Sequence, residues 1–408
     1  MDPMTESTAP LGLAHARPVF LTVLLDLLGF GLVIPLLSFY AEKYSAGPVT
    51  ITLLMASYSI AQFFGAPLWG QVSDRYGRRP VMLASIAGTA LCLAGFAAAP
   101  SLPYLFLFRT LGGLFAANIS TAQAVVADVT TEKDRARGMG LIGAAFGVGF
   151  SIGPWVGGEL SRFGLAAPIW LAAGLSLVNL GWAYARLPET RRVGDGPAPR
   201  RTLDPRSWLV GLGHPLVGLC VLLTFCVTFA FSMMETTFGL VAEHAWKLDP
   251  VGVGRMFLLI GVVGIVIQGG AIGALVKRFG EARLVVVGLC FTVVGFSLLA
   301  ASTRPEAAAF EGPARWLGCL FTATGSSLTN PSLSSLISQG VSSNEQGTIL
   351  GANQSLAALA RASAPTVGGL LYRDWFLGGA FAGGAFLMLS ALMLAIPAVR
   401  RASGPRAS

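Results

Sequence analysis

Four ionisable side chains lie inside long apolar stretches of the sequence: Asp26, Arg109, Glu235 and Arg361. A charge in hydrocarbon is unfavourable, so such a residue needs a partner or a wet cavity, and a functional role is the default interpretation. Burial disfavours the charged form of a carboxylate and a neighbouring arginine favours it, so its proton affinity changes with its surroundings. Asp26, Glu235 and the two arginines are therefore candidate functional residues.

A second group of charges lies in GQVSDRYGRR, residues 70–79, between two apolar stretches. Its Asp and Arg side chains must stay at a membrane interface or contact one another. A solvated turn is the simpler interpretation. The functional one is a reversible latch, in which Asp74 faces a helix N-terminus near Gly347 and either Arg75 or Arg78 pairs with Asp128. Such an ion pair breaks at modest cost and suits a gate.

The composition indicates which elements position these residues. Of 408 residues, 54% are hydrophobic and 12% are charged, which predicts lipid as the solvent. Continuous runs of about 20 residues predict helices that cross about 30 Å of hydrocarbon, and not the short alternating strands of a barrel. We count twelve runs: 18–40, 50–72, 80–99, 103–126, 138–160, 166–187, 214–241, 251–275, 284–302, 314–338, 347–371 and 376–399.

Lysine and arginine placement predicts the orientation. With both termini in the cytoplasm, nineteen Lys and Arg residues fall on the inner side and seven on the outer side. This is the positive-inside pattern of a multi-pass protein of the cell inner membrane. It also explains the net charge of +8 without a nucleic-acid partner, because the excess charge faces anionic headgroups.

Alternatives remain for the buried charges once the orientation is set. Glu235 falls in the outer half of span seven, where it could simply reach outer water. Asp26 could be a structural partner that neutralises Arg109. Arg361 could bind an anionic substrate group or balance Glu235.

The cysteines and histidines predict no metal site and no cofactor. All five cysteines fall in apolar runs without a C-x-x-C pair, and the three histidines sit at span edges without ligand spacing. No nucleophile is clustered with a base, so we do not expect an enzyme.

The chain contains an internal repeat. Shifted by 203 positions, Gly70–Arg79 overlays Gly273–Ala282, with Gly77 on Gly280. GPWVGG at 153–158 overlays APTVGG at 364–369. Two parallel six-helix halves are therefore predicted, over 1–187 and 214–408, joined by a cytoplasmic linker at 188–213.

Span five carries small residues at helical spacing. Gly149, Gly153 and Gly157 recur every four residues and form a smooth groove, while Pro154 favours a bend. We predict that groove and bend form a hinge against span eight, in the other half.

These motifs resemble those of the major facilitator superfamily, in particular its twelve-span drug/proton antiporters, with the tetracycline exporters most similar. GQVSDRYGRR resembles the loop between spans two and three, RTLGG at 109–113 the fourth-span motif, and the glycines of 143–158 the antiporter motif. DLLGFGLVIPLL at 26–37 and EQGTILG at 345–351 match spans one and eleven. The resemblance covers nearly the whole chain.

The resemblance implies an all-α transporter that works by alternating access. Spans one, four, seven and ten would line a central cavity and place Asp26, Arg109 and Glu235 around one water-filled space. The latch would close the cytoplasmic side. Asp74, Arg75, Gly77, Arg78, Asp128, Gly153 and Pro154 would form the gates. Spans three, eight and nine lack the acidic and histidine side chains of tetracycline exporters, so tetracycline is not the expected substrate.

We therefore predict secondary active, proton-coupled efflux of a small amphipathic compound by a monomer in the lipid bilayer. The alternatives are a facilitative uniporter and a non-transporting membrane receptor on the same scaffold. Apolar, aromatic and amide side chains suit a cavity that binds by contact area. The candidate substrate-binding residues are Phe30, Tyr58, Gln62, Asn118, Phe146, Phe231, Met234, Asn330, Gln354 and Arg361.

Overall fold

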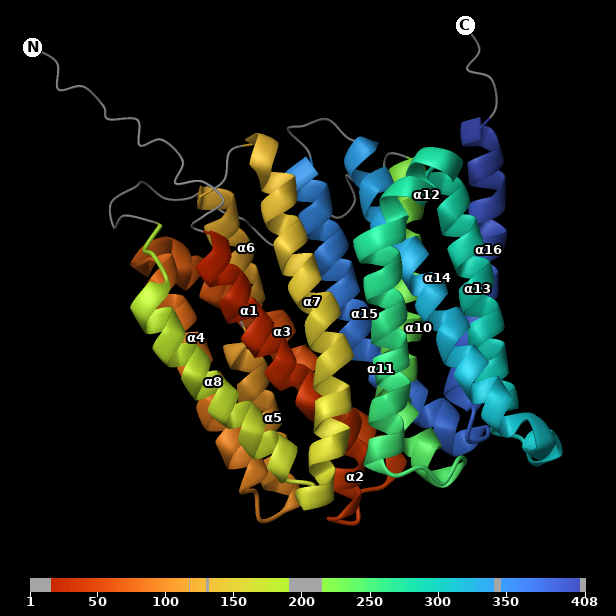
Figure 1. Cartoon of the computed structure of the whole chain (residues 1–408), viewed down its shortest axis with the longest axis horizontal. Coiled ribbons are helices and arrows are strands. Elements are labelled where there is room, and N and C mark those ends of the chain that lie inside the picture. Colours follow the sequence, from red (N-terminus) through yellow and green to blue (C-terminus); the bar gives the residue numbers. More distant parts are fainter. Residues whose placement is uncertain (1–15, 117, 130–131, 191–214, 341–345, 404–408) are drawn as a thin grey trace, which may run out of the picture.

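The computed structural model is an all-helical bundle (Figure 1). It describes residues 16–116, 118–129, 132–190, 215–340 and 346–403, and these contain no strand. Each of the twelve predicted spans corresponds to one helix or one broken helix, so the predicted architecture is confirmed. Of the described helical segments, six are long and apolar enough to cross a membrane on composition and length alone.

The first six spans form the first half of the molecule. Their elements are α1 (Ala16–Val33), η2 (Ile34–Leu36), α2 (Leu37–Glu42), α3 (Pro48–Tyr76), α4 (Arg78–Ala97), α5 (Leu102–Phe115), α6 (Asn118–Val129), α7 (Glu132–Leu160), η3 (Ser161–Phe163) and α8 (Ala167–Arg186). Span one comprises α1, η2 and α2, and span four comprises α5 and α6.

The last six spans form the second half. Their elements are α10 (Pro215–His244), α11 (Pro250–Val266), η4 (Ile267–Ala271), α12 (Ile272–Phe279), α13 (Glu281–Ala301), η5 (Pro305–Phe310), α14 (Glu311–Gln339), α15 (Gln346–Asp374) and α16 (Gly379–Ser403). Span eight comprises α11, the π-helical turn η4 and α12. Most of the expected linker at 188–213 lies outside the described residues, so its boundaries stay a prediction.

The repeat noted in the sequence ends in the same turn in both halves. Gly77 follows α3 with φ of +104°, and Gly280 follows α12 with φ of +76°. Only glycine adopts such angles without strain, and in each case the next helix begins directly afterwards. The overlay of Gly77 on Gly280 therefore reflects one shared turn between the second and third span of each half.

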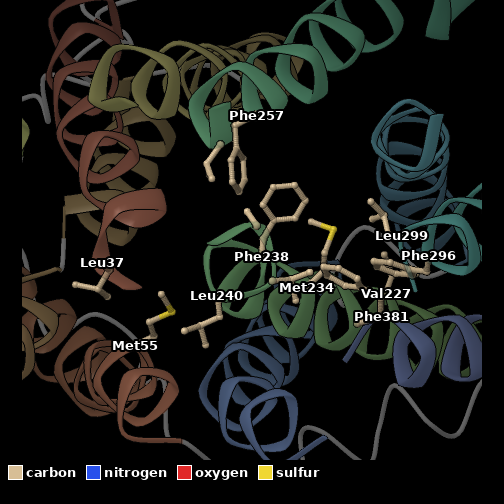
Figure 2. Packing of buried hydrophobic residues seen from close by; sticks show 14 of the residues in the cluster. Leu37, Met55, Val227, Met234, Phe238, Leu240, Phe257, Phe296, Leu299 and Phe381 are labelled. Carbon is tan, nitrogen blue, oxygen red and sulfur yellow. The ribbon is translucent and has the colours of Figure 1, made fainter. Parts of the chain in front are cut away.

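The two halves are in contact at the end of the bundle away from the start of α1 and the end of α16. We call this the far end, and the opposite one the terminal end (Figure 1). Leu37 on α2, Met55 on α3 and Leu240 on α10 belong to one buried apolar cluster. Figure 2 shows Met55 beside Leu240, with Leu37 beyond Met55. The far end is thus closed by a hydrophobic core that both halves share.

The glycines of span five pack on a different partner from the one that the sequence predicted. Gly149, Gly153 and Gly157 face α1, and a Cβ on Gly153 would come 2.8 Å from a backbone atom of that helix. A different glycine, Gly158, contacts α11 of the second half. A Cβ at this position would come 2.6 Å from the carbonyl oxygen of Pro250. The four-residue spacing puts the groove on one face of α7, and that face packs within its own half.

The bend of span five does lie against span eight, as predicted. A Cβ on Gly254 of α11 would come 2.8 Å from the carbonyl oxygen of Pro154. Nearer the middle, Gly261 leaves room for the side chain of Ser151. Towards the terminal end, a Cβ on Gly147 of α7 or on Gly273 of α12 would meet nothing within 4 Å. The two spans therefore touch at the far end and separate towards the terminal end, as Figure 1 shows.

Replacing Gly158 by alanine is expected to weaken the closed far end. The added Cβ would meet backbone and not a flexible side chain, so α7 and α11 must move apart, at a cost of about 1–3 kcal/mol. Thermal unfolding of the purified protein measures this loss. Gly174→Ala on α8 is the matched control, because a Cβ there meets nothing within 4 Å. If both variants unfold at the same temperature, the tight contact has no energetic consequence.

Candidate functional site

Arg109 is held between two aromatic rings deep in the first half. Its guanidinium carbon lies 4.5 Å from the ring centre of Tyr58 and 5.6 Å from that of Phe30. The residue is 8% exposed, and its Nε atom has no hydrogen-bond partner. Stacking on aromatic faces stabilises a buried guanidinium that has few hydrogen bonds. Phe30 and Tyr58, predicted to bind substrate, thus hold the arginine.

Asp26 and Arg109 line one cavity of about 40 Å³, which is room for a few water molecules. Its walls come from α1, α3, α4 and α5 and include Phe30, Tyr58, Cys92 and Gly112. The cavity therefore lies within the first half. Glu235 on α10 is not among its walls, so this cavity contains two of the three charges that were expected around one space.

Electrostatic interactions link Arg109 in the first half to charged groups of the second half. Glu235 interacts electrostatically with Arg361 of α15 and also with Arg109. Arg361 is exposed and Glu235 is half-buried, so both reach open space. Tyr58 in turn interacts with both Asp26 and Arg109. The ionisable groups predicted from the sequence therefore form one electrostatic chain from α1 to α15.

The break in span four follows Phe115, at the end of the helix that carries Arg109, and is supported by side chains of α3 and α4. A helix end leaves carbonyl groups unpaired, and these require donors when they are buried. Trp69 donates its indole N–H to the carbonyl of Leu114 at 2.7 Å, and Gln62 donates to that of Ala116 at 3.3 Å. Ser85 donates to the carbonyl of Phe115. Gln62 was predicted to bind substrate, but here its amide supports the broken helix.

The other predicted substrate-binding residues differ in their positions. Met234 has no exposed surface and packs in the shared core, as Figure 2 shows, so it does not line a cavity here. Phe231 is half-buried on α10, and Asn330 is exposed on α14. The side chains of Asn118, Phe146 and Gln354 lie outside the described residues.

The latch region forms one of the two ion pairs that the sequence allowed. Arg78 Nε lies 3.1 Å from Asp128 Oδ2, and its guanidinium also donates to the hydroxyl of Ser73 at 2.7 Å. Arg75 is exposed and lies over the ring of Tyr76, so Arg78 is the partner. The side chain of Asp74 and its expected contact near Gly347 lie outside the described residues.

Sequence reasoning missed Glu189, which follows α8. Its carboxylate accepts hydrogen bonds from the backbone N–H groups of Arg78 and Arg79, at 2.9 and 3.2 Å. These are the first two residues of α4, where a negative charge is stabilised by unpaired N–H groups. A carboxylate outside every span carries no sequence signal for this contact, since 110 residues separate the partners.

Comparison with known proteins identifies the family. A model of the Major Facilitator Superfamily matches residues 19–365. The chain belongs to this superfamily. It is therefore a membrane transporter and not an enzyme.

Similar proteins include known resistance proteins. The tetracycline resistance protein of class C from Escherichia coli is 30% identical over 95% of this chain and 96% of its own length. Multidrug resistance protein 2 of Bacillus subtilis is 28% identical over 85% of each chain. The crystal structure of the human organic anion transporter MFSD10 superposes with a TM-score of 0.71 at 28% identity, covering 93% of this chain and 98% of that one.

Proposed function

We propose that this transporter is a proton-coupled antiporter that exports a small amphipathic compound across the cell inner membrane. It works as a monomer, with both termini in the cytoplasm. The observation that carries the proposal is the interaction of Glu235 with both Arg109 and Arg361. The carboxylate thus interacts with one positive charge from each half.

Such a carboxylate can couple two events. When the halves separate at one end, water reaches Glu235 and its distance to each arginine changes. Both effects alter its proton affinity, so rocking of the halves and proton binding are linked. Asp26 lines the same small cavity of the first half as Arg109 and would hold that arginine in place.

The observed conformation fits one state of alternating access. Its far end is closed by the shared core and by Gly158, and the spans part at the terminal end. With the termini in the cytoplasm, this is the state that accepts substrate from inside the cell. In the opposite state, Asp74 near the start of α15 would form the inner latch, and Arg78 with Asp128 would hold the loop that presents it.

The relatives' names support an amphipathic, drug-like substrate. Two of them are resistance proteins and a third is an organic anion transporter. Arg361, which is exposed and interacts electrostatically with Glu235, would bind an anionic group of the substrate. Tetracycline remains disfavoured, because spans three, eight and nine carry no internal acid or histidine that resembles those of its exporters.

Transport in proteoliposomes tests the proposal. A panel of tetracycline, ethidium and fluorescein represents the three chemical classes in the relatives' names. We expect at least one probe other than tetracycline to accumulate against its gradient when a pH gradient is imposed, and not without it. Equal movement with and without the gradient would indicate a facilitative uniporter. No movement of any drug-like probe would favour a receptor.

A further inference from the structure

A polar cluster at the far end joins the two halves outside the central site. Glu42 ends α2 in the first half, whereas Glu243 and His244 end α10 in the second. Glu42 Oε1 lies 3.8 Å from His244 Nε2, and His244 Nδ1 lies 3.0 Å from the hydroxyl of Tyr372 on α15. Opening the far end would pull Glu42 away from the other three residues.

The carboxyl group of Glu42 interacts electrostatically with that of Glu243, which lies beside His244 at the end of α10. Within the described part of the chain, no residue donates a hydrogen bond to Glu243 Oε2, which is buried. Among the described residues, no lysine or arginine forms an ion pair with either carboxylate. Burial without a donor or a cation disfavours the charged form of a carboxyl group, so the closed far end favours a bound proton.

The other ionisable groups near the cluster form no ion pair with Glu42 or Glu243 among the described residues, apart from His244. Tyr40 and Tyr44 point into the first half, where their hydroxyls donate to the carbonyls of Ala97 and Ala99. Lys43 is exposed beside Glu42. At the end of α15, Arg373 pairs with the adjacent aspartate and not with the cluster. Among the described residues, His244, when protonated, would place a positive charge 3.8 Å from Glu42 Oε1.

We propose that the far end closes only when Glu42 and Glu243 bind one proton between them, so that each closure takes up a proton from the outer water. This inference rests on the proposed alternating access, but it concerns a second proton site, separate from Glu235. Opening the far end would put both carboxyl groups in water and release the proton.

The sign of the pH dependence follows from Glu42. Burial, and then its contact with Glu243, raises the pKa of Glu42 from 4.5 to about 8 in the closed state. In the open state, water would return this pKa towards its ordinary value. The closed state therefore binds more protons between these limits, and its population falls as the pH rises through this range. One linked proton changes the closed-to-open ratio by up to about tenfold per pH unit.

Spin labels at the far end would measure closure directly. Phe163 on η3 and Glu306 on η5 are both exposed and belong to different halves, so Phe163→Cys and Glu306→Cys provide labelling sites. Cys290, the exposed native cysteine among those described, is first replaced by serine. Distances between the labels are then recorded for the full chain in lipid nanodiscs, from about pH 5 to about pH 9.

Three variants decide the result. The intact chain should shift from short to long distances as the pH rises, by at least tenfold in the closed-to-open ratio. Glu42→Gln and Glu243→Gln should each lose this pH dependence, whereas His244→Gln should keep it. Thermal unfolding tests whether each variant is folded. If only one of the two carboxyl variants folds, that variant is enough to test the inference.

The same pH dependence in both carboxyl variants would overturn the inference, as would a far end that never opens. Both of these results concern the far end and not Glu235. The role of Glu235 is tested separately, by the transport assay. Transport driven by a pH gradient with a far end indifferent to pH would therefore contradict the second site alone. A pH-dependent far end without any transport would contradict the proposed antiport instead.

Discussion

Proteoliposomes with the Glu235→Gln variant are expected to lose transport driven by a pH gradient, for any probe that the intact protein accumulates. Glutamine keeps the size and polarity of the side chain but cannot bind and release a proton. The arginines that interact with Glu235 would then face a permanently neutral group. Accumulation should fall by at least about tenfold, because the coupling free energy between proton and substrate is removed.

The same variant should still exchange probe for probe without a pH gradient. A neutral residue resembles the protonated state, so the halves can still rock with substrate bound. Glu311→Gln is the matched control, since Glu311 pairs with Arg315 on its own helix and lies outside the central charges. Uphill accumulation by Glu235→Gln at the level of this control would show that another group carries the proton.

The Arg109→Lys variant is expected to lose transport as well, although it keeps the positive charge. Lysine replaces a planar group that stacks on Tyr58 and Phe30 with a compact ammonium that needs hydrogen bonds or water. The site supplies few hydrogen bonds, because Nε of Arg109 is already unpartnered. We expect at least a tenfold loss of transport and about 1–2 kcal/mol of destabilisation from the lost stacking.

Transport rate and thermal unfolding of the same preparation measure both effects. Arg162→Lys is the control, because its exposed side chain pairs only with Glu159 among the described residues and stacks on no ring. Normal transport by Arg109→Lys would mean that charge alone matters at this position. A variant that loses transport but keeps full stability would show that the stacking contributes little energy.

Much of the fold could be predicted because the bilayer imposes a strong constraint on sequence. Residues 80–99 read as a span, and α4 runs from Arg78 to Ala97. The breaks in spans one and eight were not predicted. A hydropathy average is not sensitive to single residues such as Pro35 in η2 or the pair Gly269 and Gly270 in η4. Both signals were present, but only the packing of neighbouring helices decides whether such residues bend a span or interrupt it.

The central charges could also be found from the sequence, because a charge in an apolar run is rare. Their grouping could not, since the arrangement of Asp26, Tyr58 and Arg109 depends on how α1, α3 and α5 pack. Glu42 and Glu243 gave no signal at all. Each comes at the end of an apolar stretch, where an acid ordinarily faces water, and only the tertiary fold brings α2 against α10.

The central claim is that proton and substrate movement are coupled through Glu235. The most direct measurement follows a pH-sensitive dye in energised inside-out vesicles while a transported probe from the panel is added. The account predicts that the probe releases protons from the vesicles with the intact protein and with Glu311→Gln, and not with Glu235→Gln. Probe transport without any proton movement by the intact protein would contradict it.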